Sequence, residues 1–280
     1  MNNFFNIKQQ LGEPYFEDKN VILYNMDCIE ALTKLEGHVN FNLTLTSPPY
    51  NIGKEYEKIK PVDEYINWSK KWMAEVYKTT ASNGSFWLNI GYMPIKEKGK
   101  AVPLSYLLWD KNDFFLIQEV VWHYGAGVAS RKSLSPRNEK ILWYVKNEQN
   151  YIFNLDSIRD PNVKYPNQKK NGKLKVNPLG KNPSDVWDIP KVTSGRNRQS
   201  AERTKHPAQT PIELFKRIIL ASSNEGDLIL DPFVGSGTAC VAAKATNRKS
   251  IGFDINSEYL DIAIKRLSEE HVVQQVLFNF

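Results

Sequence analysis

The sequence of 280 residues contains only two cysteines, Cys28 and Cys240, which stand far apart in the chain. This scarcity argues against a disulfide framework and against a zinc site, and we expect no metal. The apolar runs, such as FFLI at residues 114–117, are far too short to span a bilayer. The amino-terminal residues carry acids and amides and no signal-like apolar stretch. We therefore expect a cytoplasmic protein without a membrane segment.

The charge of the chain is mildly basic, with a net charge of +6 and a pI near 9.0, but it is unevenly distributed. Residues 164–205 include only three acidic residues, Asp185, Asp188 and Glu202. The same stretch contains these basic residues: Lys164, Lys169, Lys170, Lys173, Lys175, Lys181, Lys191, Arg196, Arg198, Arg203 and Lys205. Such a concentration suits a surface that binds a polyanion, although a solvated loop would have a similar composition.

Apolar runs typical of buried strands alternate with segments of helical periodicity along most of the chain. Strands are predicted at residues 21–26, 43–46, 85–90, 114–124, 140–146, 228–230 and 250–253. Helices are predicted at residues 29–35, 61–80, 101–109, 212–222, 237–246 and 258–269. This alternation predicts an α/β fold with a doubly wound, mostly parallel sheet. Residues 147–205 show no such periodicity, and a loop of that length should be functional or form a small subdomain.

The run DPFVGSGT at residues 231–238 lies between a predicted strand and a predicted helix. Its glycines let the backbone approach a ligand closely, and the N–H groups that begin the helix suit an anion. The next strand ends at Asp254, whose carboxylate could accept hydrogen bonds from ribose hydroxyls. Cys240 stands where a dinucleotide motif has its third glycine, and no Gly-Lys-Ser/Thr follows, so a phosphate loop is also excluded. A nucleoside cofactor without phosphate, S-adenosylmethionine, fits best; the alternative is a tight turn with two incidental acids.

The run TSPPYN at residues 46–51 follows another predicted strand and has the chemistry to hold an amine-bearing ring. An exocyclic base amine is a poor nucleophile until acceptors around its N–H bonds localise its lone pair. Ser47 is biased to extended backbone by the following proline, and Pro48 and Pro49 have fixed φ and no N–H. We expect the Pro48 carbonyl and Ser47 Oγ to be the two acceptors. Tyr50 offers a flat face for stacking, worth about 1–3 kcal/mol per base. The alternative reading of the prolines is a rigid loop.

In these motifs and in their order, the chain resembles the amino-methyltransferases of bacterial DNA restriction–modification systems. TSPPY at residues 46–50 is similar to their catalytic motif, and DPFVGSGT at residues 231–238 to their cofactor motif. HPAQTP at residues 206–211 is similar to the segment that closes over the methionine part of the cofactor. A catalytic motif that precedes the basic segment and the cofactor motif matches the beta-order group. The resemblance implies a seven-stranded methyltransferase sheet, S-adenosyl-L-methionine as cofactor and double-stranded DNA, with its target base flipped out, as substrate.

The resemblance also implies a division of the chain and a set of site residues. Residues 1–146 would be the catalytic half, 147–205 the target-recognition segment and 206–280 the cofactor-binding half. The catalytic residues would be Ser47, Pro48, Pro49 and Tyr50. The cofactor would have Asp27 facing its adenine, with Cys28 or Ile29 nearby, and Asp254 at its ribose. Its methionine side would be lined by Phe233, Gly235 and Ser236, with help from Thr210, and Asp231 and Gly237 would also belong to the cofactor site.

The first residue of the catalytic motif bears on the product. Adenine-N6 enzymes of the beta order usually have Asp there, whereas Ser47 resembles the cytosine-N4 enzymes. We therefore predict N4-cytosine methylation, with N6-adenine as the alternative. Cytosine-C5 chemistry is excluded because its nucleophilic cysteine is expected after a proline, and neither Cys28 nor Cys240 follows one.

The sequence leaves other functions open. Similar Pro-Pro-Tyr turns can serve methylation of RNA or of a protein glutamine, and the fold could also belong to a non-catalytic DNA-binding regulator. The basic segment favours DNA, and the two intact motifs favour an enzyme. A cognate restriction endonuclease is an expected partner, and the chain could be a monomer or a homodimer.

Overall fold

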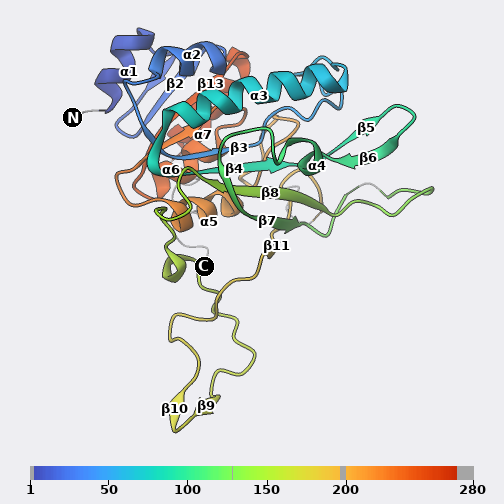
Figure 1. Ribbon diagram of the computed structural model, residues 1–280, viewed down its shortest axis with the longest axis vertical. Helices are drawn as coiled ribbons and strands as arrows, with labels where there is room; N and C mark the ends of the chain where they lie inside the picture. The colour runs from blue at the N-terminus through green and yellow to red at the C-terminus, as the bar shows by residue number, and fades with distance from the viewer. Residues whose placement is uncertain (1–2, 128, 196–199, 270–280) are drawn as a thin grey trace.

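A computed structural model of the chain describes residues 3–127, 129–195 and 200–269 (Figure 1). The centre is a nine-stranded sheet. Its strands, from edge to edge, are β1 (Phe16–Glu17), β2 (Val21–Asn25), β13 (Lys249–Asp254), β12 (Leu228–Asp231), β3 (Phe41–Thr46), β4 (Thr80–Ile90), β8 (Asn138–Val145), β7 (Phe115–His123) and β11 (Val186–Asp188).

The five strands β2, β13, β12, β3 and β4 run parallel, and β8 is antiparallel to both of its neighbours. The predicted α/β fold with a mostly parallel sheet is therefore confirmed. The sheet has nine strands rather than seven because the short strands β1 and β11 extend its two edges. Strands of two and three residues carry too little periodicity to be recognised in a sequence.

Helices cover both faces of this sheet, as a doubly wound fold requires. The helices are α1 (Asn3–Leu11), α2 (Cys28–Leu35), α3 (Val62–Thr79), α4 (Leu104–Leu108), α5 (Ile212–Ser222), α6 (Thr238–Ala245) and α7 (Ser257–Ser268). Buried side chains of α1–α4 form one apolar cluster, and those of α5–α7 form a second on the opposite face. Neighbouring residues of β2 divide between the two, Leu23 in one cluster and Tyr24 in the other, as the strand period dictates.

One predicted helix is shorter than expected. The sequence predicts a helix over residues 101–109, but residues 99–103 form β6 (Gly99–Pro103), which pairs with β5 (Tyr92–Ile95) in a hairpin. The helix α4 begins only after Pro103, whose backbone is extended and whose missing N–H suits a helix start. The helix α1 was also not predicted; it packs on α2 and buries Phe4 and Ile7 in the same apolar cluster.

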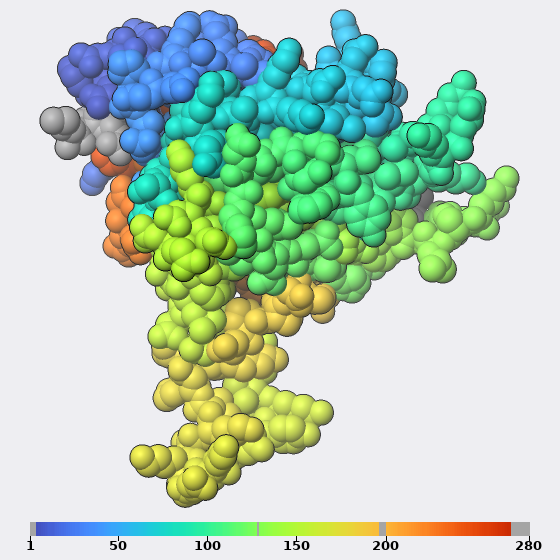
Figure 2. All heavy atoms as spheres, viewed as in Figure 1, coloured from blue at the N-terminus to red at the C-terminus, as the bar shows by residue number. Residues whose placement is uncertain are grey.

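Residues 160–181, here named the basic arm, project away from the body of the molecule (Figures 1 and 2). The arm follows the short helix η1 (Leu155–Ile158) and ends in a hairpin of β9 (Lys169–Lys170) and β10 (Lys173–Leu174). Two backbone hydrogen bonds of 2.9 Å between Asp160 and Lys181 close its base. The chain then returns to the sheet as β11, where Trp187 is buried and stacks on Trp87. In the described residues, no helix is long and apolar enough to span a bilayer.

Candidate active site

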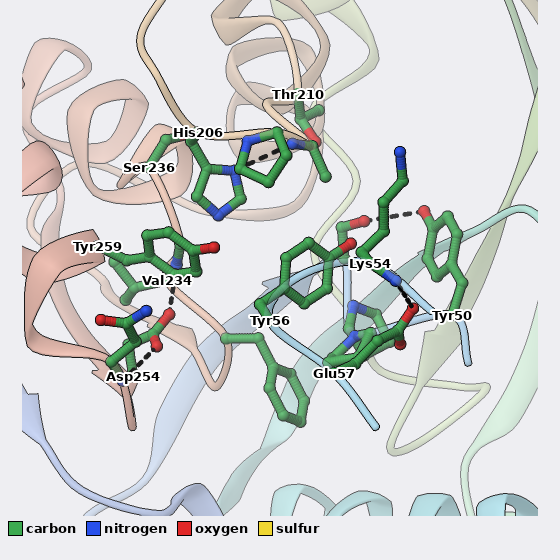
Figure 3. A pocket seen from close by; sticks show the side chains of 18 of the residues that line it. Tyr50, Lys54, Tyr56, Glu57, His206, Thr210, Val234, Ser236, Asp254 and Tyr259 are labelled. Carbon is green, nitrogen blue, oxygen red and sulfur yellow. Dashed lines mark hydrogen bonds between the residues drawn. The ribbon is translucent and has the colours of Figure 1, made fainter. Parts of the chain in front are cut away.

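The two motifs leave the sheet side by side, because β3 and β12 are parallel neighbours. The chain after β3 crosses to β4 on one side, whereas the chain after β12 crosses to β13 on the other. This reversal is the topological switch point at which open α/β sheets bind ligands. The turn of residues 46–51, here named the catalytic turn after the motif that it resembles, and that of residues 231–238, here named the glycine turn, meet there. Together they surround a single cavity of about 1000 Å³ (Figure 3).

All but one of the predicted site residues line this cavity. Those that do are Asp27, Cys28, Ser47, Pro48, Pro49, Tyr50, Thr210, Asp231, Phe233, Gly235, Ser236 and Asp254. Gly237 does not; it precedes α6 with a φ of 75°, and a Cβ there would lie 2.7 Å from the Cβ of Ala263. The geometry thus explains Gly237 by its backbone conformation and its close packing on α7.

Asp254 holds the glycine turn in place. Its Oδ2 accepts a 2.8 Å hydrogen bond from the Gly235 N–H, and its Oδ1 accepts one of 2.9 Å from Asn256 (Figure 3). Burial raises the pKa of Asp254. Each carboxylate oxygen keeps a further acceptor site, so Asp254 could also accept from the hydroxyl groups of a sugar in the cavity.

Asp231 is buried and faces the catalytic turn. Its Oδ1 accepts hydrogen bonds from Thr46 Oγ1 at 2.7 Å and from the Phe233 N–H at 3.1 Å. Burial raises the pKa of Asp231 to about 7. The hydrogen bond between Asp231 and Thr46 therefore links the ends of β12 and β3.

Asp27 and Cys28 lie where β2 leads into α2. Asp27 Oδ1 caps this helix by accepting from the backbone N–H groups of Ile29 and Glu30 at 2.9 and 3.2 Å. In the described residues, no donor reaches Asp27 Oδ2, which is available to a ligand in the cavity. Burial raises the pKa of Cys28, so its thiol stays neutral and is no nucleophile.

In the part of the chain that the structure describes, the catalytic turn has a carbonyl without a donor and a tyrosine whose hydroxyl is hydrogen-bonded. Within the described residues, nothing donates to the Pro48 carbonyl, whereas the Pro49 carbonyl accepts from Tyr65 at 2.8 Å. The Tyr50 hydroxyl lies 2.8 Å from Ser47 Oγ and 3.0 Å from Glu139 Oε2. Sequence reasoning gave Tyr50 only a stacking face and missed Glu139, which lies 89 residues away along the chain.

A cluster of three aromatic rings lines the cavity beside the glycine turn. His206 packs against Tyr56, with ring centroids 6.0 Å apart, and against Tyr259 at 4.4 Å (Figure 3). Burial and the nearby Arg266 charge lower the pKa of His206 to about 4, so the ring is neutral at pH 7. Its Nε2 would lie 2.9 Å from a Cβ placed on Gly235. Tyr56 and Tyr259 carry no motif signal, because only the fold brings them to this cavity.

Arg266 is buried beside the glycine turn and donates hydrogen bonds to it. This residue of α7 is only 3% exposed, and its Nη1 donates to the Ser236 carbonyl at 2.7 Å and to Thr238 Oγ1 at 3.0 Å. Its Nη2 lies 4.0 Å from Glu202 Oε1. A buried cation beside the turn favours an anion in the adjacent cavity, such as the carboxylate of an amino acid moiety.

A family profile described as DNA methylase matches residues 41–265 of the chain. The chain belongs to this family. It is 60% identical to the type II methyltransferase M.ScaI of Streptomyces caespitosus over 94% of this chain and 86% of that protein. It is 36% identical to the DNA adenine methyltransferase YhdJ of Escherichia coli (strain K12), over 86% of this chain and 80% of that protein.

Solved structures agree with this assignment at the level of the fold. The PvuII DNA methyltransferase, described as cytosine-N4-specific, superposes with a TM-score of 0.73 at 20% identity, covering 94% of this chain and 93% of that one. Other structures of the same fold are complexes with S-adenosyl-L-methionine. The predictions of a beta-group amino-methyltransferase of restriction–modification systems and of S-adenosyl-L-methionine as its cofactor are thus confirmed.

Proposed function

We propose that this type II DNA methyltransferase methylates the N4 amine of cytosine at a specific site in double-stranded DNA. The observation that carries the proposal is the single cavity shared by Ser47, the Pro48 carbonyl and the glycine turn. Serine at the first position of the catalytic turn favours cytosine over adenine through the family resemblance.

The residues of the cavity account for the chemistry as positioning and charge stabilisation. Ser47 Oγ and the Pro48 carbonyl accept from the two N–H bonds of a flipped base and thereby localise the lone pair of its nitrogen. S-adenosyl-L-methionine supplies an electrophilic methyl group when it is bound. Asp254 receives the ribose hydroxyls, Asp27 lies near the adenine, and Gly235 and Ser236 lie along the methionine moiety.

Adenine N6 is the second candidate product, and the 36% identity to a DNA adenine methyltransferase favours it. Both amines carry two N–H bonds, so the acceptors of the turn suit either base. Nucleoside mass spectrometry on DNA from cells that express the protein, with cells of the same strain lacking the protein as the control, separates the two. We expect N4-methyldeoxycytidine. N6-methyldeoxyadenosine would overturn the choice of base, and cofactor binding without any DNA labelling would favour a non-catalytic regulator.

We further propose that residues 147–205 form the target-recognition segment between the catalytic half, residues 1–146, and the cofactor-binding half, residues 206–280. The basic arm supports this assignment, because its exposed lysines suit the phosphates of a duplex. Arg196 and Arg198 lie outside the described residues. A cytoplasmic location and a restriction endonuclease specific for the same site complete the proposal, and the chain would act as a monomer or a homodimer.

A further inference from the structure

A largely buried ion pair lies directly behind the catalytic turn. Lys191 Nζ lies 2.7 Å from Glu139 Oε1, and the two side chains are 22% and 12% exposed. The other carboxylate oxygen, Oε2, accepts from the Tyr50 hydroxyl at 3.0 Å and from Asn89 Nδ2 at 3.1 Å. Both charged residues line the cavity.

We propose that the Lys191–Glu139 pair is a positioning device that fixes the direction of the hydrogen bonds at Ser47 and so makes Ser47 Oγ an acceptor for the base amine. This inference rests on the proposed function of Ser47. It also means that the recognition segment, through Lys191, contributes a residue on which the catalytic turn depends.

The donors and acceptors around Tyr50 determine which way the hydrogen bond between Ser47 and Tyr50 runs. Its single hydroxyl proton faces two groups that can only accept, Glu139 Oε2 and the Asn89 carbonyl at 3.2 Å. Asn89 Nδ2 donates to the Tyr50 oxygen at 3.1 Å. This orientation of the Asn89 amide is favoured because the flipped amide would place its oxygen against the Glu139 carboxylate.

One acceptor site of the Tyr50 oxygen then remains for Ser47. With its own proton directed to Glu139 or to the Asn89 carbonyl, Tyr50 has none left for Ser47 Oγ, which lies 2.8 Å away. The Ser47 hydroxyl therefore donates to Tyr50. Of the two lone pairs of Ser47 Oγ, one faces Asn89 Nδ2 at 3.4 Å, and the other is left for a group in the cavity that Ser47 lines. That is the orientation needed to accept from an amine.

Lys191 stabilises this direction of the hydrogen bonds from Ser47 to Tyr50 and from Tyr50 to Glu139. Without Lys191, the largely buried Glu139 carboxylate would have no countercharge, which is costly and favours its moving away from the Tyr50 hydroxyl. Lys191 supplies the countercharge, and its Nζ also lies 3.8 Å from the centre of the Tyr124 ring.

Lys191 follows β11, and the strand next to β11 fixes its position. The Trp122 Nε1 donates to the Ile189 carbonyl at 2.7 Å, and β11 pairs with β7. A recognition segment displaced from β7 would carry Lys191 away from Glu139.

The first test is Glu139→Gln, which keeps the shape of the side chain but introduces a donor. We expect turnover to fall by roughly a hundredfold, the scale seen when one preorganised hydrogen-bond partner is removed. The affinities for S-adenosyl-L-methionine and for DNA should stay within about twofold. The matched control is Glu119→Gln, which removes another acid–lysine pair of the same sheet, with Lys140 at 3.5 Å, and should leave turnover unchanged.

Two further comparisons separate positioning from a general loss of stability. Lys191→Met should lower turnover as Glu139→Gln does, and the double variant should lose no more than either single variant, whereas Lys191→Arg should retain most of the activity. In a Tyr50→Phe background, Glu139→Gln should have little further effect, because the connection to Ser47 is already broken.

The outcomes distinguish this inference from the proposed function. A wild-type protein that methylates no DNA would reject the proposed function. An active wild type with an equally active Glu139→Gln variant would overturn only the positioning role. Independent, multiplying losses for the Lys191 and Glu139 variants would likewise overturn it, as would a Lys191→Arg variant as inactive as Lys191→Met.

Discussion

Thr46 donates a hydrogen bond of 2.7 Å from its Oγ1 to Oδ1 of Asp231, although the two residues are 185 positions apart in the chain. Thr46 is the last residue of β3 and Asp231 the last residue of β12. Each is also the first residue of one of the two motifs. The distance between the catalytic turn and the glycine turn is therefore set by the sheet and by this buried bond, rather than by mobile loops.

Asp231 should make the stability of the protein depend on pH. Its pKa is about 7 in the folded chain, whereas an unfolded aspartate titrates near about 4. As pH rises from about 4 to about 7, the unfolded chain releases this proton first, and the folded state loses stability relative to it. Urea denaturation at several pH values gives the free energy of unfolding. Between pH of about 4 and about 7, that of the wild type should fall by a few kcal/mol more than that of Asp231→Asn, because one pKa unit corresponds to about 1.4 kcal/mol. Identical pH dependences would contradict the assignment.

The sequence predicted the part of the site that is local in the chain. Asp231 and Asp254 end predicted parallel strands, and the ends of such strands meet at one edge of a sheet, so their proximity could be anticipated. Glu139, Lys191 and Arg266 carry no comparable signal. Each acts through partners that are distant in the chain, and only the packed fold brings them together.

Ser47→Ala should separate catalysis from cofactor binding. The variant removes one of the two proposed acceptors at the base amine, and we expect turnover to fall by roughly a hundredfold. Calorimetric titration should give an affinity for S-adenosyl-L-methionine within about twofold of the wild type, since Ser47 is assigned to the base. An unchanged methylation rate would remove Ser47 from the mechanism.

Asp254→Ala should act mainly on the cofactor. The carboxylate holds the Gly235 N–H at 2.8 Å and is assigned to the ribose hydroxyls. Losing hydrogen bonds to a charged acceptor costs about 1.5–3 kcal/mol, which corresponds to a weakening of roughly tenfold to hundredfold. Asp254→Asn, which keeps one carbonyl acceptor, should lie between the wild type and Asp254→Ala. Full affinity in Asp254→Ala would reject the ribose assignment.

Gly235→Ala should lower both the stability of the protein and its affinity for the cofactor. Gly226→Ala is the control, because it should lower the stability alone. Gly235 has a φ of 48°, and its added Cβ would lie 2.9 Å from His206 Nε2. Gly226 has a φ of 82° but open space around it. Each substitution should lose about 1 kcal/mol of stability from the left-handed backbone. Only Gly235→Ala should weaken cofactor binding, by at least about tenfold. Equal affinities in the two variants would show that His206 yields and that the close approach is unimportant.

The basic arm should contribute to DNA affinity through charge alone. Lys169, Lys170 and Lys173 are exposed and belong to β9 and β10, the hairpin at the tip of the arm (Figure 1). Changing all three to Gln should lower the salt dependence of binding, because each lost phosphate contact reduces the slope of log K against log salt by about 0.9. Turnover at saturating DNA should be retained, since none of the three lines the cavity.

A control with the same change in net charge makes this test specific. Lys19, Lys70 and Lys71 are also exposed, and the last two lie on α3, at the opposite end of the molecule from the arm (Figure 1). Changing these three to Gln should alter the salt slope little if the duplex is bound through the arm. Fluorescence anisotropy with one duplex at several salt concentrations gives both slopes. Equal slopes for the two triple variants would mean that long-range attraction by net charge, rather than contact with the arm, accounts for the binding.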